Sequence, residues 1–543
     1  MAKPAKKGKG SGQAARLRQQ QEANARRRGP AQPVTATQAT PPSAAAEPAT
    51  PASSPSAERW YLDISALRIQ EWLARTPGLR FRRGASVLLS EATEKQAWVT
   101  HLPAGTAWND EAGDIDGVVS LVLTETADAT ATASQAASEA IKAMRERMPY
   151  IHIQAVLGQG GTYTQAYAAM KRDRQDGTVL LDSPPAPQEL ILAKPCDQCR
   201  LAPAVHRQVT IVRDRAPGER VLDLCAECNQ RWPAGGGTKG SRRSPRPERE
   251  LLRVLGPPAQ DLADDFAQLA EGGRSRRDDA PTQVALVYAD GNRVGDFLGQ
   301  VSKLRGSKAG TREIARQIDE AAMGALADAV RDRFPGWKRP TVIAHLAGGD
   351  DLLISVPAAD AWQFTRVLLA SFGARVSKIA PPKVSPPTMS AALVFAHQSH
   401  PFSDLVRIAG RELRAAKSAT RGEAASVSFR DLTADGGDQL GHRSPLTAAY
   451  LDEHAAALAG IEEVPPSRRQ ALLALLRQDA TADAIRRLTD FEDNYPLWEV
   501  IAGPGATPSQ VREVLASSEQ KQAELRQLLD IARHWRTHPR EEA

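Results

Sequence analysis

The sequence lacks long apolar runs, which excludes several classes of protein. No stretch of about 18 or more consecutive apolar residues occurs in the 543 residues, so we expect no transmembrane helix. The N-terminus is basic but has no apolar core of the kind found in secretory signals, and this predicts a cytoplasmic protein. The chain is long enough for several domains.

Positive charge is concentrated near the N-terminus. Residues 1–50 hold nine Lys/Arg and two Asp/Glu, so the remainder is near neutral although the total is +6. Basicity therefore does not by itself predict nucleic-acid binding by the body of the protein. Residues 1–57 have almost no large apolar side chains, which predicts disorder. Such a tail could contact RNA or DNA, but we favour a solvated, dispensable tail.

Cysteine is scarce, and all four cysteines lie in two CxxC pairs separated by 25 residues. The segment between the pairs has a hairpin-like pattern at 208–224. This spacing is typical of a structural zinc ribbon with four thiolate ligands. A disulfide is disfavoured in the cytosol, and four thiolates leave no open position for catalytic zinc. The predicted zinc ligands are Cys196, Cys199, Cys225 and Cys228.

Carboxylates are predicted at the ends of two strands. Residues 284–290 are an apolar run that ends on Asp290. Residues 341–357 hold two β-prone runs around a Gly-Gly pair, followed by Asp350 and Asp351, which predicts a β-hairpin. Adjacent acids repel each other, and a divalent cation would turn this repulsion into binding. Two strands that deliver carboxylates to their ends suit a two-metal phosphoryl-transfer site.

The remaining pattern predicts a mixed α/β fold. Residues 58–193 suggest the order β-α-β-α-β, with Asp63 at the end of the first strand and a basic loop within 79–91. Residues 281–435 suggest β-α-ββ-α-β-α-β, and the last hundred residues suggest helices, including one at 509–536. We interpret a group of arginines in the first region as a solvated edge, with phosphate contact as the alternative: Arg75, Arg80, Arg82 and Arg83.

The motifs together resemble a known family. They are Asp290-Gly291-Asn292-Arg293-Val294-Gly295, then Gly348-Gly349-Asp350-Asp351, then Ala415-Ala416-Lys417. Their order and distances resemble the second palm of the polymerase-like large subunit of type III CRISPR effectors, a relative of GGDEF cyclases. The N-terminal pattern YLDIS…IQEWLART…RRGAS resembles that family's first, degenerate palm. No His-Asp pair precedes this region, so we expect no HD nuclease domain.

The resemblance implies two ferredoxin-like palm domains, the first degenerate, with a four-cysteine zinc ribbon between them and a helical C-terminal domain. The implied segments are a tail (1–57), a first palm (58–193), a zinc ribbon (194–232), a linker (233–280), the catalytic GGDD palm (281–435) and a helical domain (436–543).

The resemblance also implies a function. The family makes cyclic oligoadenylates from ATP in antiviral defence, which implies a nucleotidyltransferase that uses two Mg²⁺ or Mn²⁺ ions. The implied metal ligands and catalytic residues are Asp290, Asp350 and Asp351. The implied nucleotide-binding residues are Gly291, Asn292, Gly295, Gly348, Gly349 and Lys417.

The expected partners are ATP or another nucleoside triphosphate, guide or target RNA, other effector subunits and a second copy of the chain, with no membrane. One alternative is a non-catalytic, RNA-binding scaffold subunit. Another is a GTP-using cyclase, which is less favoured because GGDD stands in place of GGDEF.

Overall fold

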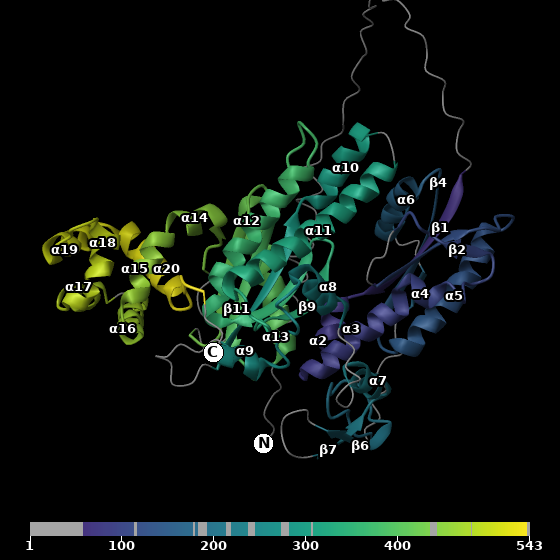
Figure 1. Cartoon of the computed structure of the whole chain (residues 1–543), viewed down its shortest axis with the longest axis horizontal. Helices are drawn as coiled ribbons and strands as arrows, with labels where there is room; N and C mark the ends of the chain where they lie inside the picture. Colours follow the sequence, from purple (N-terminus) through teal and green to yellow (C-terminus); the bar gives the residue numbers. More distant parts are fainter. Residues whose placement is uncertain are drawn as a thin grey trace, which may run out of the picture. The chain divides into compact units, whose positions relative to one another are not determined.

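The computed structural model describes residues 58–112, 117–176, 180–182, 193–212, 219–236, 245–272, 282–305, 308–434, 443–478 and 480–539. The predicted tail at 1–57 lies outside these residues. The described residues form two large sheets, a small hairpin sheet and many helices (Figure 1), which confirms the mixed α/β class. None of the helices in these ranges is long and apolar enough to cross a membrane.

The first sheet has the strand order β2-β3-β1-β4-β5. Its central strand β1 pairs antiparallel with both β3 and β4. Small side chains of α5, including Ala133 and Ala140, are buried in the same core as Ile64 and Leu121 of the sheet. The strands are β1 (Arg59–Leu67), β2 (Thr106–Trp108), β3 (Val118–Leu123), β4 (His152–Gly160) and β5 (Leu180–Asp182). The helices are α2 (Ile69–Ala74), α3 (Leu79–Thr93), α4 (Lys95–Trp98), α5 (Ala129–Arg147) and α6 (Tyr163–Asp176).

The second sheet has the order β13-β12-β11-β8-β10-β9, with β8 inside it. Alternate β8 residues serve opposite faces: Val287 packs with α11 and α12, whereas Leu286 packs with α13. The strands are β8 (Gln283–Asn292), β9 (Ile343–Gly348), β10 (Asp351–Pro357), β11 (Thr388–His397), β12 (Ser426–Asp431) and β13 (Leu446–Thr447). The helices are α10 (Val294–Arg305), α11 (Lys308–Arg333), η1 (Ala358–Asp360), α12 (Ala361–Ile379) and α13 (Phe402–Thr420).

Both sheets share one internal order. If the first four strands of each are numbered along the chain, the order in space is two, three, one, four, with antiparallel neighbours. A βαββαβ chain with this order has the ferredoxin-like topology. In the second sheet β12 then adds parallel to β11 across α13.

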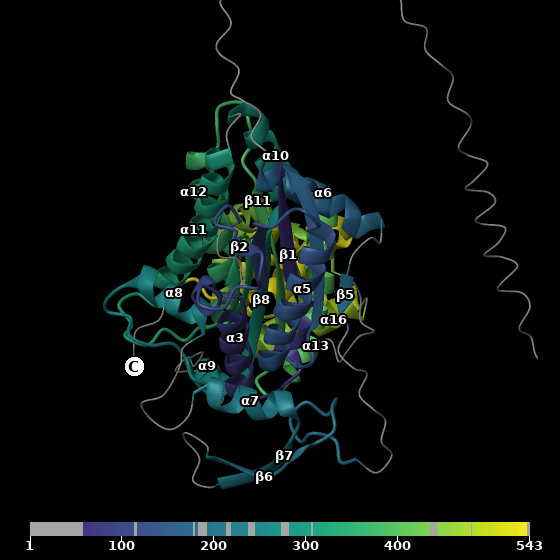
Figure 2. The ribbon, with the colours of Figure 1, turned by 90° about the vertical axis from the view of Figure 1, so that its right-hand side faces the viewer.

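A small hairpin sheet and three helices follow the first sheet along the chain. They are β6 (His206–Val212), β7 (Glu219–Leu224), α7 (Ala226–Ala234), α8 (Arg246–Leu255) and α9 (Phe266–Gly272). Figure 2 shows the hairpin next to α7. Leu251 of α8 is fully buried in the core of the second sheet, and Leu269 of α9 is fully buried with Leu79 and Ile343. The described part of the predicted linker is therefore packed.

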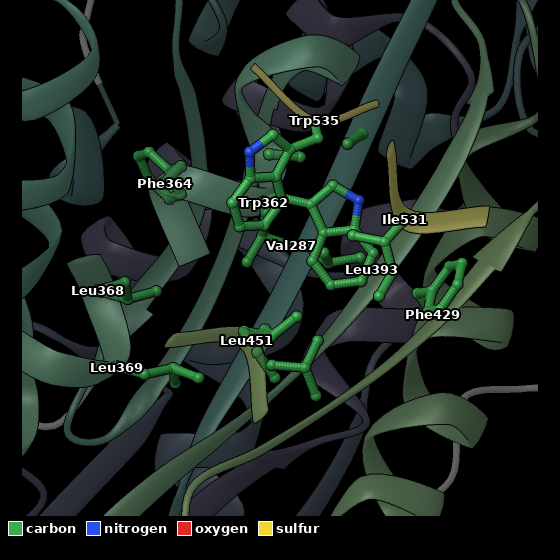
Figure 3. Close-up of a cluster of buried hydrophobic side chains, with 14 of the residues drawn as sticks. Val287, Trp362, Phe364, Leu368, Leu369, Leu393, Phe429, Leu451, Ile531 and Trp535 are labelled. Carbon is green, nitrogen blue, oxygen red and sulfur yellow. The ribbon is translucent and has the colours of Figure 1, made fainter. Parts of the chain in front are cut away.

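The C-terminal helices share a core with the second sheet (Figure 3). Trp362 of α12 and Phe429 of β12 lie in this core with Ile531 and Trp535. The predicted single helix at 509–536 is wrong: the chain is extended at Ser518, whose side chain accepts a hydrogen bond from the Lys521 backbone and so starts a new helix. The helices are α14 (Ala448–Glu453), α15 (Ala455–Glu463), α16 (Pro466–Arg477), α17 (Thr481–Thr489), η2 (Glu492–Asn494), α18 (Tyr495–Ala502), α19 (Pro508–Ser517) and α20 (Glu519–Ala532).

Two details of the first region differ from the prediction. Asp63 lies in the middle of β1, not at its end, and its buried carboxylate accepts hydrogen bonds from the Ser120 and Tyr163 hydroxyls at 2.6 and 2.8 Å. The predicted basic loop within 79–91 is helix α3. The apolar residues of this stretch follow a helical period, which the arginines between them obscured.

Arg82 and Arg83 of α3 are buried, so the interpretation as a solvated edge is wrong for these two residues. The Arg83 side chain is 6% exposed, pairs with Glu248 of α8 at 2.8 Å, and donates to the carbonyls of Ala263 and Asp264. The Arg82 guanidinium lies 3.9 Å from the centre of the Phe402 ring of α13. These side chains join the first region to the elements around the second sheet.

The buried pair predicts a large loss of stability when one partner is removed. We expect Glu248→Ala to lower the free energy of unfolding by about 3 to 5 kcal/mol, because it leaves the buried Arg83 charge without its closest carboxylate. Glu250→Ala on the same helix is the matched control: its exposed pair with Arg253 contributes little. Urea unfolding measures both variants, and equal losses would contradict the assignment.

Candidate active site

The pairing of β8 with β10 brings the predicted aspartates together. Leu352 lies opposite Ala289 in this antiparallel pair. The same register, continued by one residue, places Asp351 opposite Asp290, and the next step places Asp350 opposite Gly291. Residues that face each other across antiparallel strands have Cα atoms about 4.5–5.5 Å apart. The predicted meeting of the carboxylates is therefore reproduced by the strand register.

The hairpin turn is held at its tip. Asp351 pairs with Gly348, so that Gly349 and Asp350 form a two-residue loop. Gly349 has a φ of 63°, a left-handed conformation that glycine adopts without strain. Its backbone N–H donates to the Asp319 carboxylate of α11 at 2.7 Å. Helix α11 thereby fixes the position of the turn that carries Asp350.

Gly291 is required by the closeness of a carboxylate. A Cβ at this position would lie 2.4 Å from Oδ2 of Asp350, far inside contact distance. At Gly295 and Gly348 a Cβ would meet nothing within 4 Å. The packing explains Gly291 as the position that admits Asp350. The predicted phosphate contacts of the other two glycines stay predictions.

The aspartates repel one another in a half-buried setting. Burial, and then the charge of Asp290, raises the pKa of Asp350 to about 6 and that of Asp351 to about 7. Lys417 of α13 contacts Asp290 Oδ2 and donates to the Gly291 carbonyl at 2.8 Å. One cation faces three carboxylates, so the charge balance of this site favours a divalent cation such as Mg²⁺.

Asn292 is buried and hydrogen-bonded within the second sheet. It is 1% exposed, and its amide nitrogen donates to the hydroxyls of Thr388 and Ser390 at 2.8 and 2.9 Å. These bonds hold the end of β8 against β11. The nucleotide contact predicted for Asn292 stays a prediction.

The four cysteines form a compact cluster. Their Sγ atoms all lie within 4.8 Å of one another, and no other group of three or more His, Cys, Asp or Glu among the described residues is so close. The Sγ atoms of Cys199 and Cys225 are 3.8 Å apart, the separation expected around a tetrahedral ion with Zn–S bonds of about 2.3 Å. The three aspartates are less tightly gathered, as two ions about 4 Å apart would allow.

The thiols also oppose one another's ionisation. Hydrogen bonds from the neighbouring thiols lower the pKa of Cys196, whereas contact with the Cys196 sulfur raises the pKa of Cys228. Because these buried groups cannot all ionise without a cation, the donor set fits a metal such as zinc.

Sequence reasoning missed a residue that reaches the site from the first region. Gln70 of α2 donates to Asp351 Oδ2 at 3.4 Å, although 281 positions separate them. Tyr288 of β8 lies close to the same amide, and its pKa is raised by burial and by the charge of Asp351. The only available signal was that Gln70 lies in the IQEWLART stretch of the family resemblance.

Comparisons with known proteins agree with this geometry. Residues 283–425 match the family model described as Cas10/Cmr2, second palm domain. Among solved structures, Csm1 of T. onnurineus has a TM-score of 0.50 and 13% identity, with 88% of this chain and 69% of that chain covered. The apo Csm1–Csm4 cassette gives 0.50 and 12%, covering 88% and 70%. These likenesses show the fold alone, and no curated protein sequence matches the chain.

The domain around the aspartates is therefore a palm: a ferredoxin-like sheet with acidic strand ends. Residues 283–425 match the second palm domain of the Cas10/Cmr2 family. This confirms the predicted resemblance to the polymerase-like large subunit of type III CRISPR effectors.

The raised pKa values predict that the aspartates cost stability at high pH. An unfolded carboxyl ionises near pH 4, so between about pH 4 and 7 the folded state binds more protons and the free energy of unfolding falls as pH rises. In EDTA at pH 8, we expect the Asp350→Asn/Asp351→Asn double variant to be more stable than the wild type by about 2 to 4 kcal/mol. This advantage should shrink toward pH 5.

Urea unfolding across this pH range measures the effect. Asp296→Asn is the matched control, because Asp296 is exposed and lies in the first turn of α10, shortly after Asp290 in the chain. A double variant that is less stable than the wild type at pH 8 would contradict the mutual repulsion.

Proposed function

We propose that this chain is a nucleotidyltransferase that converts ATP into cyclic oligoadenylate-type second messengers in antiviral defence of the type III CRISPR kind. In each step a ribose 3′-hydroxyl attacks the α-phosphate of a second nucleotide, a new phosphodiester forms, and pyrophosphate leaves with the proton passing to solvent or base. Closing the last bond within the oligomer gives the ring.

The residues of the palm would have distinct roles. Asp290, Asp350 and Asp351 would hold two Mg²⁺ ions between the ends of β8 and β10. Bound Mg²⁺ would stabilise negative charge on the phosphates and lower the pKa of the attacking hydroxyl. Lys417, which contacts Asp290, is a point cation placed to meet a triphosphate once metal takes over that carboxylate.

One observation carries this proposal. The support is that, in the region matching the Cas10/Cmr2 second palm domain, Asp351 lies opposite Asp290 when the β8–β10 register is continued by one residue, and Lys417 of α13 contacts Asp290. Isolated acidic pairs on surfaces have neither the burial nor the raised pKa values found here. The combination supports a functional site over a solvated turn.

Nucleotide turnover tests the proposal. Purified full-length protein is incubated with each of the four nucleoside triphosphates and Mg²⁺, with and without RNA, and products are identified by mass spectrometry. We expect cyclic products from ATP and their loss in the Asp350→Ala/Asp351→Ala variant, because the metal ligands are removed. Asp296→Asn, which changes an exposed aspartate nearby, should retain activity. Undiminished product from the double variant would refute these roles.

A second candidate is a non-catalytic scaffold subunit. The observation that favours it is the contact of Lys417 with Asp290, because a lysine can neutralise a carboxylate in place of a metal ion. A wild-type chain that gives no product with any triphosphate, yet co-purifies with guide RNA and partner subunits, would favour this function.

Partner subunits follow from the same likeness. Because the fold of this chain resembles Csm1 of the Csm1–Csm4 cassette, we infer assembly with a Csm4-like subunit. Guide RNA and a second copy of the chain remain predicted partners. Co-purification of tagged protein from its native source tests them.

We also propose that the four-cysteine cluster is a structural zinc ribbon between two palms, of which the first sheet is the degenerate one. Elemental analysis should find about one zinc per chain, and Cys228→Ser should lose it because three thiolates bind zinc less tightly. His206→Ala is the control: His206 lies on the hairpin between the two cysteine pairs but outside the sulfur cluster. Zinc retained by Cys228→Ser, or absent from the wild type, would contradict the assignment.

A further inference from the structure

Helix α2 of the first region lies against the palm that carries the aspartates. In Figure 1 it lies near α13, and its Ala74 is buried with Leu286 and Tyr288 of β8. Gln70 is one turn earlier on this helix, so it points toward the same face of β8. The Gln70 amide therefore reaches the acidic end of the palm from α2, a helix that follows the first strand of the other sheet.

The amide contacts a carboxylate of the acidic site. Its nitrogen donates to Oδ2 of Asp351 at 3.4 Å, and the Tyr288 side chain lies close by. The amide engages only one oxygen of Asp351, so the other oxygen stays available to an ion. Groups that hydrogen-bond a metal-ligating carboxylate fix its orientation, and their removal commonly changes metal affinity by about 10- to 100-fold.

Contacts between α2 and α7 fix the position of Gln70. Two residues further along α2, the Trp72 indole donates to Glu227 of α7 at 2.9 Å. Arg231 of α7 donates to the Trp72 carbonyl at 2.9 Å and lies over its ring. Trp72 and Arg231 are 1% and 0% exposed, so these contacts are shielded from water. Cys225 caps the N-terminus of α7 and Cys228 lies within it, so α2 is anchored on the four-cysteine cluster.

We propose that Gln70 is a positioning residue that holds Asp351 in the orientation in which a divalent cation binds. Helix α2 of the first region, which is held by contacts with α7 next to the cysteine cluster, then completes the metal site of the palm. This inference rests on the proposed function only in taking Asp351 as a metal ligand.

Metal binding tests this role separately from catalysis. Binding of Mn²⁺ to the zinc-loaded full-length chain is measured by the electron paramagnetic resonance signal of the free ion, with the Asp350→Ala/Asp351→Ala variant as background. Gln70→Met keeps the length of the side chain and removes the donor. We expect it to weaken Mn²⁺ binding about 10-fold, with thermal unfolding near that of the wild type.

Two further variants complete the design. Gln70→Ala repeats the loss of the donor in a smaller side chain and should weaken Mn²⁺ binding to a similar extent. Gln135→Met on α5 is the matched control, because Gln135 is exposed and bonds only a neighbouring side chain, Glu139, among its described contacts. It should bind Mn²⁺ as the wild type does.

The dependence of turnover on Mg²⁺ concentration distinguishes a metal-positioning role from a packing role. If Gln70 acts through the metal, activity lost by Gln70→Met at low Mg²⁺ should return when Mg²⁺ is raised about 10-fold or more. Wild-type Mn²⁺ affinity in both Gln70 variants, or an activity loss that Mg²⁺ does not cure, would overturn the inference.

The two proposals can fail independently. Weakened Mn²⁺ binding in the Gln70 variants of a chain that makes no cyclic product would support Gln70 and reject the synthase. Cyclic product from a wild type whose Mn²⁺ affinity equals that of Gln70→Met would support the synthase and reject Gln70.

Discussion

The antiparallel pairing of β8 with β10 is the constraint on which the rest of the site depends. It brings Asp290, Asp350 and Asp351 to one end of a sheet whose interior strand β8 is almost entirely buried. Like charges at this distance would separate if the backbone were free to move. Pairing of β8 on both sides, the α11 contact to Gly349 and the absence of a side chain at Gly291 keep them together.

Much of the molecule is arranged to hold this palm from outside. The C-terminal helices share a core with α12, and the Asp431 carboxylate of β12 accepts a bond from buried His534 at 2.9 Å. On the other side, Arg82 and Arg83 of α3 insert between α8, α9 and α13. A buried cation costs free energy unless it is paired with a carboxylate or stacked on a ring. These contacts therefore mainly fix the position of α3 and add little net stability.

The sequence predicted features that depend on local pattern. The apolar run that ends on Asp290 and the hairpin that carries Asp350 and Asp351 follow from alternation and turn chemistry, and both are present. Features that depend on distant partners were not predictable. The partner that buries Arg83 is Glu248, 165 positions away, and Gln70 meets Asp351 across 281 positions, so no local pattern indicates either contact. A charged residue is therefore expected to be exposed only if the rest of the chain supplies no buried partner for it.

A series of side-chain contacts connects the cysteine cluster with the aspartates, so the cluster influences the palm as well as its own local fold. Cys225 caps α7. Glu227 and Arg231 of α7 hold Trp72, and Trp72 lies on the short helix that presents Gln70 to Asp351. A six-residue helix has little stability of its own, so its position must come from such tertiary contacts. A metal bound to the thiols would therefore affect the palm through the position of α2.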